Sequence, residues 1–176
     1  MKIKNLKRFL TRTAKDESGN ATLEFVMTMP LVITLMFSTV ESGILLVQQM
    51  MLERALDVNV RQLRLGANMT QSELAASICD DIAVISNCDQ SMTLELTVLS
   101  KTTWNVPATS AVCYNRQEDI TPVTSYTGGI DSDLMLVRAC VIVDPLFPLL
   151  GLGVAMTETN NGDFTISARS AFVNEP

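Results

Sequence analysis

The sequence predicts an α+β protein in which a long N-terminal helix leads into a head with a short helix and an antiparallel sheet. Three observations support this fold class. An apolar run follows a basic segment, a helical repeat of apolar residues follows that run, and strand-like alternations fill the second half of the chain. No repeat or low-complexity tract is present, so we expect a single head domain.

The first element is an apolar segment from about Ala21 to Val47. Its core, Phe25 to Val40, contains sixteen residues without a charge. About 20 residues cross the hydrocarbon core of a bilayer, so we expect a transmembrane helix over residues 20–50. A secretory signal peptide is the competing interpretation, but its apolar region is short and ends in small residues, whereas this run continues past Glu41.

Charge is distributed unevenly around this segment. Residues 1–19 contain six basic and two acidic residues, a net charge of +4, and the remainder contains seven basic and seventeen acidic residues, a net charge of −10. Basic residues that flank a span stay in the cytoplasm. We therefore expect a single-pass inner-membrane protein with a cytoplasmic N-terminus, a leader over residues 1–19, and a periplasmic C-terminus.

The helix is predicted to continue beyond the membrane over residues 51–69, giving more than forty residues in all. Residues of its buried face recur at steps of three and four: Leu52, Ala55, Leu56, Asn59, Val60 and Leu63. Gly66 then offers a helix stop.

The head is predicted to occupy residues 70–176. A helix over residues 71–78 is indicated by Thr70 as N-cap with Glu73 three residues later, the spacing of a capping box. Alternating apolar and polar residues predict strands over residues 92–98, 134–143 and 164–170. Pro107, Pro122 and the Gly128-Gly129 pair separate these elements.

Four cysteines, Cys79, Cys88, Cys113 and Cys140, all follow the apolar segment. In an oxidising periplasm they can form two disulfides, and three pairings are possible. Sequence proximity and strand placement favour Cys79 with Cys88 and Cys113 with Cys140. Zinc is the weaker interpretation, because the chain has no histidine and no CxxC pair.

The composition argues against catalysis and against bound cofactors. Without histidine there is no Ser-His-Asp or Cys-His arrangement. Acidic groups at Asp80-Asp81, Glu118-Asp119 and Asp131-Ser132-Asp133 do not match an EF-hand loop. The acidic head disfavours nucleic acid. We expect no enzyme activity, no cofactor, no metal and no small-molecule substrate, and we expect the exposed chemistry to serve protein contacts.

The junction Ser18-Gly19-Asn20-Ala21-Thr22-Leu23-Glu24-Phe25 places one carboxylate inside the apolar helix. An acidic residue costs about 2.5 to 3.5 kcal/mol at a span centre and somewhat less near a span end, so Glu24 needs a compensating partner. The junction resembles the processing site of type IVb pilin precursors of the Flp, or tight adherence (Tad), class. The resemblance implies cleavage between Gly19 and Asn20 by a prepilin peptidase, with Phe25 as the sixth mature residue and Glu24 paired with the terminal amine of a neighbouring subunit.

A second resemblance covers nearly the whole chain. The segments ATLEFVMTMPLVITLMFSTVESG, VRACVIVDPLFPLLG and FTISARSAFVNEP are similar to TadE-like minor pilins (pseudopilins). The resemblance implies a subunit that takes part in Tad pilus assembly or initiation and supports adhesion. Its implied partners are prepilin peptidase, other pilins and Tad inner-membrane assembly proteins, and incorporation into the extracellular pilus is one implied fate. The alternative is an unprocessed, membrane-anchored periplasmic protein-binding module.

The sequence allows two interpretations for each of two features, Glu41 and the loop of residues 147–153. Glu41 follows Glu24 by seventeen residues, about 25 Å along a helix, so it is either an interfacial carboxylate that reaches water or a charge at a subunit contact. The apolar loop of residues 147–153 either forms a partner patch or covers the head's own core.

Overall fold

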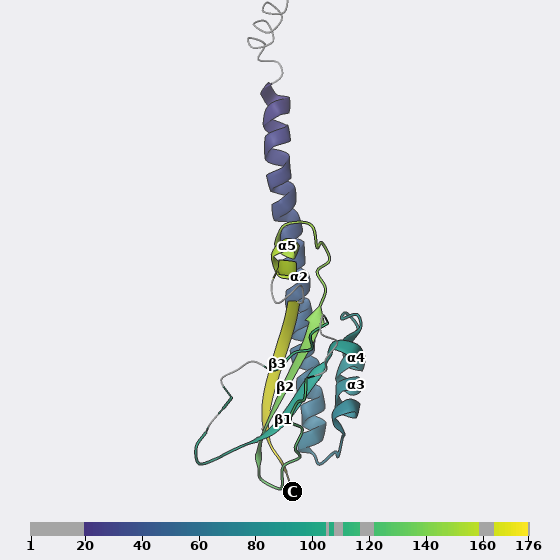
Figure 1. The fold of residues 1–176 in the computed structure, drawn as a ribbon, viewed down its shortest axis with the longest axis vertical. Helices are drawn as coiled ribbons and strands as arrows, with labels where there is room; N and C mark the ends of the chain where they lie inside the picture. Colours follow the sequence, from purple (N-terminus) through teal and green to yellow (C-terminus); the bar gives the residue numbers. More distant parts are fainter. Residues whose placement is uncertain (1–19, 105, 108–110, 117–121, 159–163, 176) are drawn as a thin grey trace, which may run out of the picture.

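The computed structural model describes residues 20–104, 106–107, 111–116, 122–158 and 164–175. Its elements, in chain order, are α2 (Asn20–Arg64), α3 (Gln71–Asp81), α4 (Cys88–Ser91), β1 (Thr93–Leu99), β2 (Leu134–Val143), α5 (Leu152–Glu158) and β3 (Phe164–Val173). The first half of α2 projects beyond the head and its second half lies along the sheet (Figure 1). The predicted α+β class is confirmed.

Helix α2 has two halves of opposite character. It is 45 residues long, about 68 Å at 1.5 Å per residue. Large apolar side chains of the first half are exposed, whereas in the second half the predicted apolar stripe is buried. By length and composition α2 is able to cross a membrane. The long helix and its buried face are therefore confirmed.

A glycine terminates α2 by adopting a left-handed conformation, with φ of +88° at Gly66. The backbone nitrogen of Ala67 donates to the carbonyl of Gln62, and that of Gly66 donates to the carbonyl of Leu63. This pair of bonds is the Schellman arrangement, which satisfies the last carbonyls of a helix. The chain then turns back toward α3, and the predicted helix stop is confirmed.

The short helix α3 begins as the sequence predicts and ends three residues later than expected. The Thr70 side chain accepts from the Glu73 nitrogen, and the Glu73 carboxylate accepts from the Thr70 nitrogen at 2.8 Å, which completes the capping box. Leu74 and Ile78 are buried in the core that α2 shares with the sheet.

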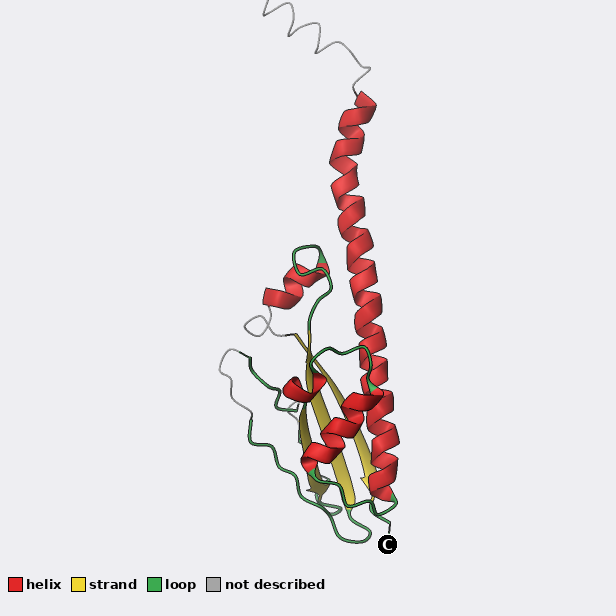
Figure 2. Ribbon diagram, turned by 90° about the vertical axis from the view of Figure 1, so that its right-hand side faces the viewer, coloured by secondary structure: helices red, strands yellow, loops and turns green. Residues whose placement is uncertain are grey.

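The sheet is antiparallel with strand order β1-β2-β3, and α2 and α3 cover one face of it (Figure 2). In the register, Leu96 lies opposite Val137 and Val137 lies opposite Ser170. The central strand β2 is buried along almost its whole length. Alternate β2 residues face the helices, which explains half of this burial.

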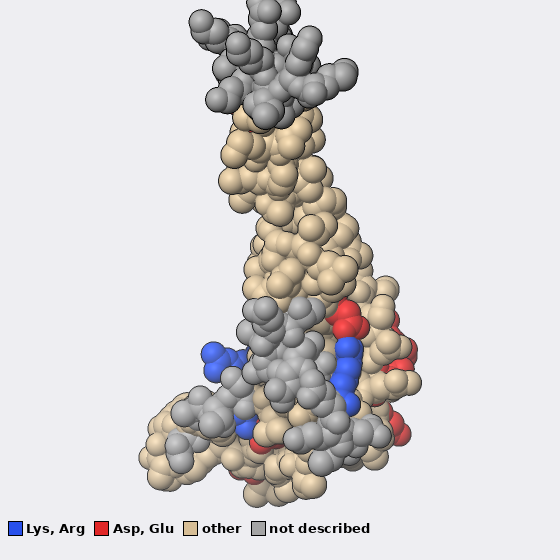
Figure 3. All heavy atoms as spheres, turned by 45° about the horizontal axis from the view of Figure 1, so that its top comes forward, with Lys and Arg blue, Asp and Glu red and all other residues tan. Residues whose placement is uncertain are grey.

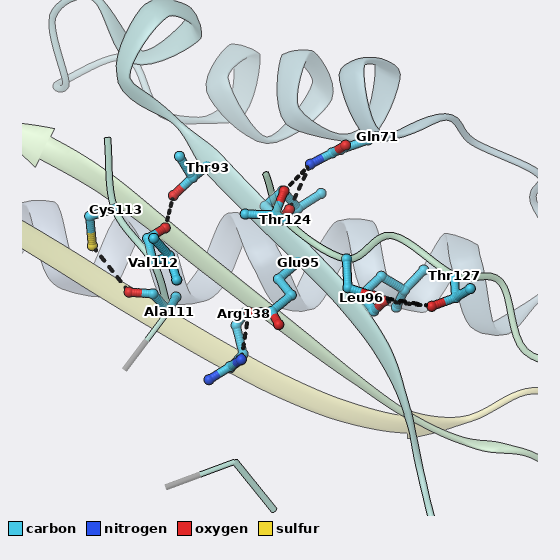
Figure 4. Close-up of polar contacts among 12 residues, drawn as sticks. Gln71, Thr93, Glu95, Leu96, Ala111, Val112, Cys113, Thr124, Thr127 and Arg138 are labelled. Carbon is cyan, nitrogen blue, oxygen red and sulfur yellow. Dashed lines mark hydrogen bonds and ion pairs between the residues drawn. The ribbon is translucent and has the colours of Figure 1, made fainter. Parts of the chain in front are cut away.

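The second face of the sheet is partly covered by residues 111–116. The Thr93 hydroxyl donates to the carbonyl of Val112 at 2.6 Å (Figure 4). Cys113 is bonded to Cys140 of β2. This contact covers Cys140, one of the β2 residues that point away from the helices.

The three predicted strands are present among the described residues, with β1 starting one residue late and β3 running to Val173. Helices α4 and α5 were not predicted. Each is short, below the length at which a 3.6-residue period can be recognised in a sequence.

Candidate functional site

The N-terminal end of the described chain carries the first predicted site. Gly19 lies outside the described residues, and Asn20 is the first residue of α2. Glu24 and Phe25 are exposed on the following turn, with 59% of Phe25 accessible. Among the described residues, no hydrogen bond or ion pair involves the Glu24 carboxylate. This end of the helix therefore presents a carboxylate and an aromatic ring outward.

Glu41 is in a different environment, with only 2% of its surface exposed. Its two carboxylate oxygens accept hydrogen bonds from the backbone nitrogens of Leu146 and Phe147 at 2.8 and 3.0 Å. Of the two interpretations of Glu41, the carboxylate that reaches water is wrong, because the loop after β2 folds over it. A role at a subunit contact stays a prediction.

The same loop follows α2 toward its N-terminus beyond Glu41. The Phe147 and Phe37 rings lie 4.5 Å apart between centroids, and the Ser38 hydroxyl accepts from the Leu152 nitrogen at 3.2 Å. Gly151, at φ +56°, comes so close that an added Cβ would overlap the Ser38 oxygen. The 147–153 loop thus packs on the long helix, neither on the sheet nor free of the protein.

Sequence reasoning did not identify Phe37, Ser38 and Gly151 as contact residues. Ser38 carries a local signal, since a polar side chain in an apolar run calls for a partner. Its hydroxyl also donates to the Thr34 carbonyl, an ordinary role in a helix, so that signal does not point to a loop more than a hundred residues away.

A buried polar cluster joins α2 to α3. Asn59 is fully buried, and its amide nitrogen donates to the Ala55 carbonyl at 2.9 Å and to the Asp81 carboxylate at 3.0 Å. Its amide oxygen accepts from the Ser77 hydroxyl at 2.6 Å. These bonds satisfy Asn59 within an otherwise apolar stripe, and they fix the position of one helix on the other.

Both disulfides lie in the head. Cys79 at the end of α3 is bonded to Cys88 of α4, and Cys113 is bonded to Cys140 of β2. These are the pairings that proximity and strand placement favoured. The first closes the turn between two short helices, and the second attaches residues 111–116 to the sheet.

Two ion pairs hold the side of the head that faces away from the helices. Arg138 of β2 and Glu95 of β1 lie opposite each other, nearly buried, with nitrogen and oxygen 2.5 Å apart (Figure 4). Arg116 makes two bonds to Asp144 at 2.6 and 3.1 Å. The second pair lies just before the loop that covers Glu41.

Contacts at the start of α3 shift the pKa values of two residues, Glu73 and Tyr126. Two hydrogen bonds from Thr70 lower the pKa of Glu73 below its usual value, because they favour the carboxylate. Burial, assisted by the nearby Glu73 charge, raises the pKa of Tyr126, whose hydroxyl donates to the Met69 carbonyl at 2.8 Å. Both shifts reflect local structural contacts.

Charged side chains gather on the head. In the space-filling view, Lys, Arg, Asp and Glu lie over the lower part of the described chain, and the visible face of the projecting helix shows none (Figure 3). Among the described ranges, no three Asp, Glu, Cys or His side chains gather where they could hold a metal ion. Glu118 and Asp119 lie outside those ranges.

These features define a class of protein in which one apolar helix, compatible with a single-pass membrane anchor, continues into a disulfide-bonded α+β head. Residues 19–58 match the family model described as TadE-like protein, which supports a TadE-like protein of the Tad pilus system. The match covers the apolar helix and part of its extension. Searches of curated proteins and of solved structures found no significant match.

Proposed function

We propose that this protein is a minor pilin of the Tad (Flp, type IVb) pilus, processed by prepilin peptidase between Gly19 and Asn20 and taking part in pilus assembly or initiation. The TadE-like match, which begins at residue 19, carries the proposal. In this proposal the protein has a structural role, with other pilus components as partners, and its likeness to the TadE-like family supports that role. The protein supports adhesion indirectly in this proposal, because the assembled pilus is what attaches to a surface.

Topology follows from charge and from the disulfides. The net charge of +4 in residues 1–19 keeps this end in the cytoplasm, where the peptidase would cut before the span. The head, with its two disulfides, is suited to the oxidising periplasm. Extraction of the processed chain from the inner membrane would then deliver the head to the pilus.

In this proposal, the Glu24 carboxylate makes the charge pair that joins one subunit to its neighbour. Its carboxylate is exposed near the start of α2, at a depth where an unpaired charge is unfavourable. Cleavage after Gly19 creates a terminal amine on Asn20, and the amine of a neighbouring subunit would neutralise Glu24. A Glu24→Gln variant should therefore still be cleaved but should enter pili less efficiently, measured as the pilus-associated fraction of the processed chain.

The test is the N-terminus and mass of the protein from cells with and without prepilin peptidase. We expect a chain that begins at Asn20 in the wild type, and an uncleaved chain in the peptidase mutant and in Gly19→Ala. Gly43→Ala is the matched control, because Gly43 lies in α2 with open space around an added Cβ, so this variant should be cleaved normally. An intact leader in every sample would overturn the proposal and favour the unprocessed periplasmic binding module.

Pilus counts and surface attachment test the rest of the function. Cells that lack this protein should assemble few or no pili and attach poorly. Wild type and Gly43→Ala should restore both properties, and Gly19→Ala should restore neither.

A further inference from the structure

The segment from Pro145 to Met156, here called the 145–156 segment, contains no charged residue. It leaves the sheet after β2, runs along α2 toward the N-terminal end of that helix, and returns through α5 to β3 (Figure 1). The part of α2 that it contacts, from Thr34 to Glu41, is the C-terminal end of the apolar run. A part of the head thus packs on the helix that is proposed to cross the membrane.

The depth of this contact follows from helix geometry. About 20 residues cross the hydrocarbon, so a span that starts at Ala21 ends next to Glu41. The tip of the segment, Gly151, lies against the Thr34 carbonyl. Thr34 precedes Glu41 by seven residues, or about 10 Å along the axis. The tip therefore lies inside the outer half of the span, at the depth of about 5 to 10 Å that interfacial elements reach.

The backbone of the segment is suited to this depth, where unbonded polar groups are costly. Glu41 accepts from the nitrogens of Leu146 and Phe147, and Ser38 accepts from that of Leu152. The nitrogens of residues 150 and 153 donate within the segment. Pro145 and Pro148 have no N–H to satisfy. The polar side chains of α2 thus supply acceptors that water would supply elsewhere.

The side chains that point away from α2 are apolar. Leu146, Leu149, Leu150 and Val154 are exposed, and Leu149 is 86% accessible. The ion pair between Asp144 and Arg116 lies immediately before the segment, and Glu158 ends α5. Charges therefore bracket the apolar stretch, as expected for a loop that enters a bilayer and leaves it on the same side.

We infer that the 145–156 segment inserts into the periplasmic leaflet of the membrane that α2 spans, as a second lipid contact that sets the height and tilt of the head. The occupant of its exposed apolar face is lipid, because that face continues the lipid-facing surface of α2. The inference rests on the proposed membrane anchoring of α2 and assigns the segment a role that the pilus function does not require.

Quenching of tryptophan fluorescence by brominated lipid tests this inference. The chain has one tryptophan, Trp104, so Trp104→Phe gives a silent background for single additions. Leu149→Trp probes the segment and Leu31→Trp probes the span. Leu65→Trp is the matched control, since Leu65 is a leucine with 71% exposure that lies 24 residues beyond Glu41. Each full-length variant is reconstituted in phosphatidylcholine vesicles brominated either high or low on the acyl chain.

We expect Leu149→Trp to lose most of its emission with bromines high on the chain, Leu31→Trp to lose most with bromines low on the chain, and Leu65→Trp to be unaffected by either. An unquenched Leu149→Trp beside a quenched Leu31→Trp would overturn the inference and leave the anchor intact. In that case, blue-shifted emission would assign the apolar face to a contact within this chain or with a second copy of it. Absence of quenching in all three variants would refute membrane anchoring itself and the inference with it.

Discussion

The carboxylate of Glu41 accepts a hydrogen bond from the backbone nitrogen of Phe147, a residue 106 positions later in the chain (3.0 Å). A second oxygen of the same carboxylate binds the preceding nitrogen, that of Leu146. One side chain of the apolar helix thus holds the start of the loop between β2 and α5. The order of that loop depends on an interaction made at the C-terminal end of the apolar run of α2.

Glu41→Ala should release this loop. Two backbone donors would lose their acceptor, and an unsatisfied buried donor costs about 1 to 3 kcal/mol. We expect a lower free energy of unfolding in detergent and faster proteolytic cleavage within residues 145–152. Glu41→Gln should have a smaller effect, because an amide keeps one acceptor oxygen. Glu53→Ala, at an exposed position of the same helix, should change little, and an equal loss in both alanine variants would contradict this role for Glu41.

Gly151→Ala should separate the loop from α2. Gly151 and Gly66 both have positive φ, so alanine is strained at either position by roughly 1 kcal/mol. Only at Gly151 does the added methyl also meet Ser38 and Thr34, whereas Gly66 is open. Gly151→Ala should therefore destabilise the protein more than Gly66→Ala in the same unfolding assay.

A double variant isolates the cause of that difference. Removing the hydroxyl in Ser38→Ala makes room for the methyl of Gly151→Ala, so the two changes together should cost less than the sum of the single changes. Strict additivity would indicate that Gly151 acts through its backbone conformation alone.

The two disulfides should contribute unequally to stability. They close chain separations of 9 and 27 residues, which the chain-entropy model values at about 2.5 and about 3.5 kcal/mol. Replacing Cys113 and Cys140 by alanine should lower the denaturant midpoint more than the same change at Cys79 and Cys88. The opposite order would show that the α3–α4 turn carries more of the head's stability than its loop length implies.

The capping box of α3 should make the head sensitive to acid. The folded-state pKa of Glu73 is lowered, so its ionised form stabilises the fold at pH values above the unfolded pKa of about 4.3. This contribution is lost as the pH falls through the folded pKa. Glu73→Gln should therefore be less stable than wild type near neutral pH, and the difference in melting temperature should shrink on acidification. A difference that is constant with pH would contradict the assignment.

Local patterns in the sequence were sufficient for most of the fold. The stripe from Leu52 to Leu63, the capping box at Thr70 and the alternation in β2 each depend on neighbours within a few residues, so they can be recognised without tertiary structure. The cysteine pairings needed one further step, the placement of strands. Helices α4 and α5 were missed because each is too short to display a period.

The candidate site, like the fold, was only partly predictable from the sequence. Glu24 and Phe25 stand out in the sequence because a charge and a ring interrupt an apolar run, and the TadE-like match includes them. Glu41 also stands out as a charge, but nothing in the local sequence shows what surrounds it. Of its two interpretations, the one in which it reaches water was wrong.

The sequence by itself determined the apolar helix, its amphipathic extension, the charge asymmetry across it and the α+β character of the head, because each depends on the order of neighbouring residues. Only the tertiary structure decided that Glu41 is buried and that the 145–156 segment lies on α2. Those facts depend on backbone donors that reach Glu41 and Ser38 from more than a hundred residues away, and the local sequence around either side chain carries no trace of a partner at that distance.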